Sequence, residues 1–280
     1  MFLPNELVDY ILSFLQSDPY FLEMCTHADP ILSKLAERYV YADITLFDDP
    51  HPKVISRTTH QLTQILANKP EVSHYIRSLN IYLKDYGNSP LIALSSLLPT
   101  FSQLTSVTLI GNQKDSCWDE LPKKFRQAFV LFLRAQVREL CISSVSSFPL
   151  SSLDGCRKLG VVTLDLCGEM QYDKESMKDR LASPLLKHFA FRSCHRMRME
   201  DITSWVQARN LHTLEFTGAP EDVERSFQEH LPPLLAACSH SLTNLCLDLK
   251  DKCTFFIPLK SMSQKLTQFR CARISLYGHY

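Results

Sequence analysis

The sequence has no net charge and no long hydrophobic run. Thirty basic and thirty acidic side chains cancel over 280 residues, so no global field favours nucleic acid or an anionic membrane, although a local patch stays open. No apolar stretch approaches the roughly eighteen residues of a membrane span. The chain begins directly on a helical pattern, with no room for a signal peptide. We therefore expect a soluble intracellular protein, cytoplasmic and/or nuclear, with no nucleic-acid or membrane partner.

Linear motifs of catalysis and metal binding are also missing. The sequence contains no G-x-S-x-G elbow, no G-x-x-x-x-G-K-[ST] loop, no G-x-G-x-x-G and no H-E-x-x-H. Its ten cysteines form no C-x-x-C pair and no zinc-like group with histidine, so we expect most of them to be reduced and buried. The sequence predicts no enzyme, catalytic residue, cofactor or metal. A hydrolase whose site leaves no linear motif remains an open alternative.

The first stretch, residues 3–46, predicts three short helices and the start of a strand. Its first apolar stripe has helical spacing and comprises Leu7, Val8, Ile11, Leu12 and Leu15. Asp18-Pro19 and Asp29-Pro30 mark the next two helix starts, since aspartate accepts free N–H groups and proline fits the first helical position. A segment of this size is too small to bury a full core, so its stripes need a neighbour.

Residues at the opening, middle and end of this stretch match the sequence motif of a known family. They are Leu3, Pro4, Glu6, Leu7, Ile11, Leu12, Leu15, Leu22, Cys25, Ala36, Arg38, Tyr41, Ile44, Thr45 and Leu46. In this pattern the stretch resembles an F-box, in particular that of the F-box families of mushroom-forming fungi. Leu32 occupies the position where the family has tryptophan. Leucine buries less area and offers no N–H donor, which weakens the expected contact with a partner.

The resemblance implies the substrate-recognition subunit of an SCF-type ubiquitin ligase. Such a subunit docks a Skp-type adaptor and, through it, a cullin, while its other domain holds a protein substrate. The adaptor contacts implied here are Leu3, Pro4, Leu7, Val8, Ile11, Leu12, Leu32, Leu35 and Tyr39. The alternative is a scaffold that recruits no ligase and uses these helices as a cap on its own repeats. An exposed Leu7, Ile11 and Leu15 stripe would favour a missing partner, and a buried stripe would favour the cap.

Residues 47–74 predict a connector with one helix, at Thr58–Leu66. From residue 75 to residue 280 an apolar-x-x-apolar-x-apolar pattern recurs, which is the strand signature of a leucine-rich repeat. About eight instances begin at Ile76, Leu104, Val137, Leu159, Leu186, Leu211, Leu242 and Leu266, spaced by 22 to 33 residues. The pattern predicts an α/β solenoid of parallel strands on a concave face and helices on a convex face.

Three repeats continue the motif with Asn112, Cys167 and Cys194, which we expect to turn inward and satisfy backbone groups. The helices predicted between strands are Ser95–Phe101, Trp118–Ala135, Met199–Ala208 and Ala219–Cys238. Helical spacing favours core packing for Trp118 and Trp205.

Alternate strand residues should face outward and meet a protein substrate. The candidates are Asn80, Tyr82, Thr108, Ile110, Thr163, Asp165, Arg192, Glu215 and Asp248; the short Ala190 belongs to the same face. Arg192, His195, Arg196 and Arg198 form a basic cluster that could receive a phosphate or an acidic segment. We favour the simpler interpretation, in which these residues form a solvated loop that binds no ligand.

Overall fold

The computed structural model describes residues 4–16, 18–47, 56–83, 88–112, 116–168, 184–192, 205–206, 210–217, 224–248 and 268–271. Helices and parallel strands alternate along these ranges, which confirms the α/β class. The chain divides into two units: Met1–Thr108 with Pro122–Phe129, and Leu109–Leu121 with Val130–Tyr280. This division does not fall at the limits expected from sequence, 46/47 and 74/75.

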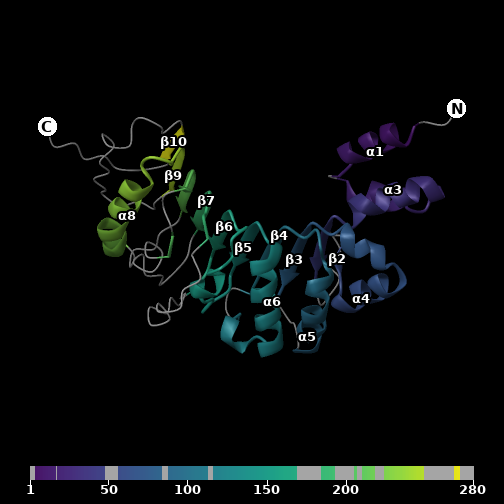
Figure 1. Cartoon of the computed structure of the whole chain (residues 1–280), viewed down its shortest axis with the longest axis horizontal. Coiled ribbons are helices and arrows are strands. Elements are labelled where there is room, and N and C mark those ends of the chain that lie inside the picture. Colours follow the sequence, from purple (N-terminus) through teal and green to yellow (C-terminus); the bar gives the residue numbers. More distant parts are fainter. Residues whose placement is uncertain are drawn as a thin grey trace. The chain divides into compact units, whose positions relative to one another are not determined.

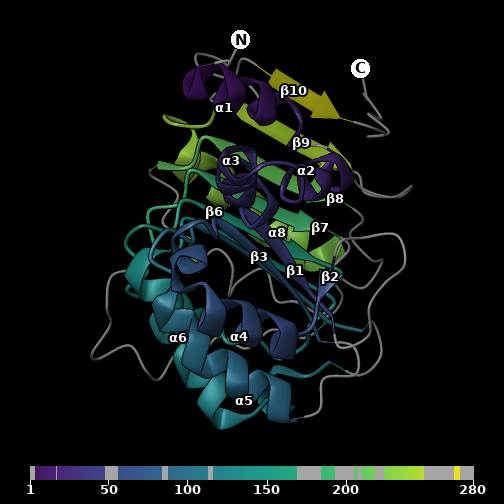
Figure 2. The ribbon, with the colours of Figure 1, turned by 90° about the vertical axis from the view of Figure 1, so that its right-hand side faces the viewer.

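Three helices open the first unit, as predicted: α1 (Asn5–Phe14), α2 (Pro19–Cys25) and α3 (Pro30–Val40). The Asp18 carboxylate accepts the Phe21 N–H at 3.0 Å, and the Asp29 carboxylate accepts the Ile31 N–H at 2.8 Å. The expected caps therefore set both helix starts. The helices gather together in Figure 2, with a small core of their own made by Leu12, Leu22, Cys25 and Ala36.

The first unit continues into parallel strands β1 (Asp43–Leu46), β2 (Ser56–Arg57) and β3 (Ser78–Tyr82). β1 lies between β2 and β3 and pairs with both. The strand that ends the predicted F-box segment is thus the neighbour of the first predicted repeat strand. The connector helix is confirmed as α4 (Thr59–Asn68), which begins with a capping box of Thr58 and Gln61.

One further α-helix and two 3₁₀ turns belong to the repeats of the first unit. The 3₁₀ turn η1 (Pro70–His74) precedes β3, and α5 (Asn88–Leu97) with η2 (Leu98–Thr100) follows it, earlier than the predicted 95–101. Helices α4 and α5 lie side by side (Figure 2).

Strand β4 (Ser106–Ile110) and helix α6 (Lys123–Gln136) both run across the division between the units. The predicted helix 118–135 is split into η3 (Trp118–Glu120) and α6. Pro122 lies between them. Leu121, just before it, is extended (ψ 147°), the conformation that a following proline favours, and this ends the first helical turn.

The second unit contains five strands of five residues: β5 (Glu139–Ser143), β6 (Val161–Asp165), β7 (His188–Arg192), β8 (Thr213–Thr217) and β9 (Asn244–Asp248). With β10 (Gln268–Cys271) they pair in chain order, all parallel, and β5 to β9 lie side by side in Figure 1. The 3₁₀ turn η4 (Leu150–Leu153) and helix α8 (Glu224–Cys238) connect strands. All strands of the predicted repeats therefore form where the pattern places them.

The apolar positions of each repeat make the core. The first residue of each described motif is at most 1% exposed, as at Val137, Leu159 and Leu186. Trp118 and Trp205 are buried, as predicted, and the Trp118 ring packs edge-on against Phe148. The predicted helix 199–208 lies outside the described residues except for Trp205 and Val206.

One of the expected corner residues is confirmed. Cys167 is fully buried, and its thiol donates to the carbonyl oxygens of Ile142 (3.3 Å) and Asp165 (3.4 Å). Asn112 is half-buried, while Cys194 lies outside the described residues. Burial raises the pKa of Cys141 to about 11 and of Cys156 to about 12, so these thiols are poorly reactive.

Two glycines of the second unit give opposite predictions for substitution by alanine. A Cβ at Gly111 would lie 2.1 Å from the Ser144 carbonyl oxygen, whereas a Cβ at Gly160 would meet nothing within 4 Å. Gly111→Ala should lower the free energy of unfolding by about 1–3 kcal/mol, because backbone must move. Gly160→Ala should leave it unchanged or raise it by about 0.4–1 kcal/mol. Urea denaturation of both variants tests this, and equal midpoints would contradict it.

Candidate functional site

Large apolar side chains are exposed on the three N-terminal helices. Eight of the twelve exposed large hydrophobic residues in the described part of the chain lie there: Leu7, Tyr10, Ile11, Phe14, Tyr20, Phe21, Met24 and Ile31. We call this set the apolar helical surface. Soluble monomers rarely expose apolar side chains in such density, and a gathering of this kind marks an interaction site.

Helix α1 has two apolar stripes. Val8, Leu12 and Leu15 face the small helical core. Leu7 and Ile11 are 43% and 45% exposed on another side, one helical turn apart. Tyr10 and Phe14 extend that exposed side, with their rings edge-on at 4.7 Å between centroids. Because a single soluble helix needs only one apolar stripe for its own core, the second is available to a partner.

The structure places the predicted adaptor contacts in three groups. Pro4, Leu7 and Ile11 are exposed, whereas Val8, Leu32, Leu35 and Tyr39 are half-buried and pack around the small core. Leu12 is 2% exposed, so it is a core side chain of the segment and not an accessible contact. Leu3 lies outside the described residues.

Sequence reasoning missed the larger part of the apolar helical surface. The missed residues are Tyr10, Phe14, Tyr20, Phe21, Met24 and Ile31. Tyr10 and Phe14 had a signal, since they follow Leu7 by three and seven positions and so share its side of a helix.

Tyr39 fixes α1 against α3. Its hydroxyl lies 3.2 Å from the Asp9 carbonyl oxygen and 3.1 Å from the Asp9 carboxylate, and donates toward both. Burial, followed by the hydrogen bond to Asp9, raises the pKa of Tyr39. The residue therefore serves packing and orientation within the helical segment.

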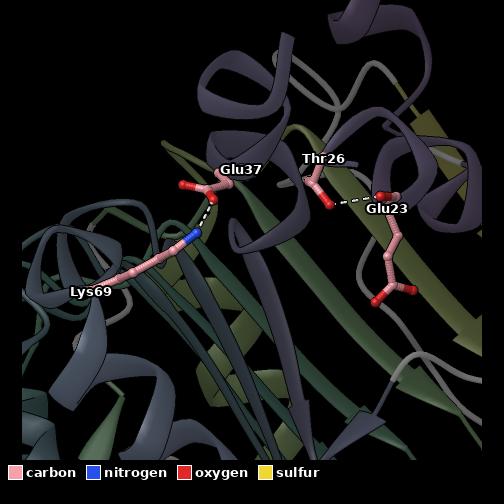
Figure 3. Close-up of polar contacts among 4 residues, drawn as sticks. All are labelled: Glu23, Thr26, Glu37 and Lys69. Carbon is pink, nitrogen blue, oxygen red and sulfur yellow. Dashed lines mark hydrogen bonds and ion pairs between the residues drawn. The ribbon is translucent and has the colours of Figure 1, made fainter. Parts of the chain in front are cut away.

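An ion pair joins α3 to the end of α4 (Figure 3). The Lys69 ammonium donates to the Glu37 carboxylate, whose side chain is only 12% exposed. This hydrogen bond raises the pKa of Lys69. Figure 3 also shows the Thr26 hydroxyl donating to the Glu23 carbonyl oxygen at 2.7 Å, at the end of α2. The Glu37–Lys69 ion pair therefore links the helical segment to the connector helix α4 by a specific contact.

The second candidate surface is the outward side of the strands. In the first unit Asn80 donates to the Thr45 hydroxyl at 3.3 Å, and the Tyr82 ring stacks on Phe47 with centroids 3.9 Å apart. Thr108 and Ile110 are half-buried on β4. Each of these four predicted residues is thus partly open to solvent, as the alternation requires.

In the second unit the same side carries Thr163, Asp165 and Glu215, which are half-buried, and the exposed Arg192. Asp248 belongs to β9, but its side chain lies outside the description. Ala190 was expected to face outward yet is fully buried, because its short side chain lies in register between Thr163 and Glu215.

Arg192 is held by a two-point ion pair. Its Nε and a terminal guanidinium nitrogen each donate to a Glu215 carboxylate oxygen at 2.9 Å. This hydrogen bonding raises the pKa of Arg192. The guanidinium is therefore neutralised within the face. The other members of the predicted basic cluster, at 195, 196 and 198, lie outside the described residues.

His188 predicts a specific pH dependence of stability. Burial lowers its pKa below the ordinary 6.5 in the folded state, so folding favours the neutral ring. The stability that comes from burying the neutral His188 ring is complete above pH 6.5 and is lost as the pH falls toward the pKa of His188 in the folded state. His188→Gln should therefore lose less stability than the wild type between pH 7.5 and pH 5.5, roughly the interval in which histidine titrates. Urea unfolding at both values tests this, and an identical loss would contradict it.

The Glu37–Lys69 pair predicts an asymmetric response to substitution. Lys69→Met leaves a nearly buried carboxylate unpaired and should lower the free energy of unfolding by about 1–2 kcal/mol. Adding Glu37→Gln should recover part of that loss, since the charge is gone. Lys34→Met, at an exposed lysine of α3, is the matched control and should change little. Equal urea midpoints for Lys69→Met and Lys34→Met would exclude this role.

No helix among the described residues is long and apolar enough to cross a membrane. The same residues contain no group of three or more metal-ligating side chains. No family model matches the chain, and neither a curated protein nor a solved structure matches it.

Proposed function

We propose that this chain is the substrate-recognition subunit of an SCF-type ubiquitin ligase. Its N-terminal helices dock a Skp-type adaptor and, through it, a cullin, while the strands of the repeats bind a protein substrate. The observation that carries the proposal is the apolar helical surface, which adds exposed partner-binding area to a segment that resembles an F-box.

The exposed stripe of α1 supports adaptor docking in particular. Leu7 and Ile11 are the two predicted adaptor contacts on that helix that are exposed, and Tyr10 and Phe14 widen the same side. Aromatic side chains bury large areas at interfaces with few rotatable bonds. The Leu32 position is half-buried in the helical packing, so the leucine that replaces the family's tryptophan contributes to the segment's own stability.

The chain itself performs no chemistry under this proposal. Its contribution is proximity, because a substrate held on the strands raises the effective concentration of its lysines near the ubiquitin carried by another subunit. The strand side carries mostly small and polar side chains, together with Tyr82 and Ile110, and a fixed Arg192–Glu215 pair. Such a surface suits a protein or peptide better than a small molecule.

The alternative is a scaffold without a ligase, in which the helices cap the repeats. That function requires Leu7 and Ile11 to be covered by the chain itself. Their exposed fractions of 43% and 45% favour a separate partner, although Leu15 is half-buried against the helical core.

Copurification with a purified Skp adaptor tests the proposal. Leu7→Ala/Ile11→Ala should weaken binding at least about tenfold, since two central apolar contacts are lost. Tyr10→Ala/Phe14→Ala should do the same. The matched control is Ile92→Ala/Leu131→Ala, which removes two exposed apolar side chains elsewhere and should leave binding intact.

Leu12→Ala is a separate control for folding, because Leu12 lies in the small core. Circular dichroism should show a loss of helix stability in that variant and unchanged spectra in the other three. Absence of adaptor binding by the wild-type chain would reject the ligase function and leave the scaffold.

A further inference from the structure

The residues that precede the strands of the second unit lie next to one another at the amino ends of β5, β6 and β7. The N–H groups of Gly160 and Val161 donate to the Arg138 carbonyl oxygen at 2.9 and 3.0 Å. Those of Lys187 and His188 donate in turn to the Gly160 carbonyl oxygen at 2.8 and 3.0 Å. Arg138, Gly160 and Lys187 are therefore neighbours just before consecutive strands, with about 4.8 Å per step.

Four basic side chains gather along this line. Arg138 and Lys187 are exposed, and so are Arg157 and Lys158 in the turn just before Gly160. We call these four residues with Gly160 the amino edge. One exposed carboxylate, Glu139, follows Arg138, so the four cations and this acid leave a net charge of three positive units.

The cations of the amino edge have no acidic partner within the described part of the chain. Arg192 and Lys69 form ion pairs with Glu215 and Glu37, whereas none of the four cations does. Arg138 and Lys187 lie two strand spacings apart, roughly 10 Å, with Gly160 between them, so their like charges repel one another at low ionic strength. An anionic partner would relieve this repulsion, because the single carboxylate of Glu139 does not balance the four cations of the amino edge.

Gly160 leaves an opening in the middle of the amino edge. A Cβ at this position would meet nothing within 4 Å, and the backbone is not in the left-handed region that favours glycine. Neither packing nor conformation among the described residues therefore requires a glycine. Gly160 directly precedes β6, and the open space beside it leaves room for the backbone of a partner to approach closely.

We propose that the amino edge binds an acidic segment of a partner protein. Carboxylates of the segment meet Arg138, Lys187 and the Arg157–Lys158 turn, and its backbone passes over Gly160. Single-stranded nucleic acid is bound through stacking of bases on aromatic rings as well as through charge. The amino edge has no aromatic side chain, so a peptide fits it better. The site is separate from the adaptor surface and does not depend on the proposed function.

Fluorescence anisotropy with the full chain tests the site. The probe is a fluorescein-labelled peptide of alternating glutamate and serine, and its partner probe replaces every glutamate by glutamine. We expect binding of the glutamate peptide alone. Arg138→Glu/Lys187→Glu should raise its Kd by about tenfold or more, which is a loss of at least about 1.4 kcal/mol.

The matched control is Lys123→Glu/Lys124→Glu, which changes the net charge by the same amount at exposed positions of α6. It should leave the Kd within about twofold, because Lys123 and Lys124 begin α6, about 20 Å of helix before its end near Arg138, and exposed charges at that distance are screened. Gly160→Leu should weaken binding several-fold by filling the opening, with an unchanged urea midpoint, since the added side chain meets open space.

Four outcomes would overturn the proposal: no binding of the glutamate peptide, equal binding of the glutamine peptide, equal weakening in the Lys123/Lys124 control, or tighter binding of a single-stranded oligonucleotide of the same charge. Adaptor copurification on the same variants separates this site from the proposed function. The amino-edge variants should keep adaptor binding, and Leu7→Ala/Ile11→Ala should keep peptide binding.

Discussion

The structure depends on burial of three apolar side chains per repeat on one side of a parallel strand. No five-residue strand is stable alone, because its apolar side and its backbone groups need neighbours. Each strand of the second unit finds them in the strands before and after it, in strict chain order. The alternate residues are thereby turned outward together, and the functional surfaces of the repeats follow from the same packing that forms the core.

The N-terminal helices are stabilised in a different way from the strands. Their small core of Leu12, Leu22, Cys25 and Ala36 is enough to hold three helices together, with help from the Tyr39–Asp9 contact, while the Glu37–Lys69 pair joins α3 to the end of α4. It is not enough to cover all of their apolar side chains. What the segment leaves exposed is therefore as informative as what it buries, because the proposed adaptor docking requires apolar side chains at the surface.

Most strands could be predicted from sequence, because the motif places apolar residues at fixed offsets and each offset has one packing role. β2 could not, since Ser56-Arg57 is two residues long and has no apolar alternation. The Glu37–Lys69 pair leaves no pattern either, because its members are 32 residues apart. The exposed stripe of α1 could have been predicted from the helical spacing of Tyr10 and Phe14 with Leu7. It was missed because the aliphatic residues of the neighbouring stripe have the same spacing. The charges of the amino edge become neighbours only when the repeats are aligned, as Arg138 and Lys187 share one motif position.

The junction between α3 and β1 consists of only Tyr41 and Ala42, and the Ala42 carbonyl oxygen accepts the N–H groups of Arg77 and Ser78 at 2.8 and 2.9 Å. A substitution that displaces α3 would therefore also displace the carbonyl oxygen to which the start of β3 is hydrogen-bonded, so the register of the first strands depends on the position of this helix.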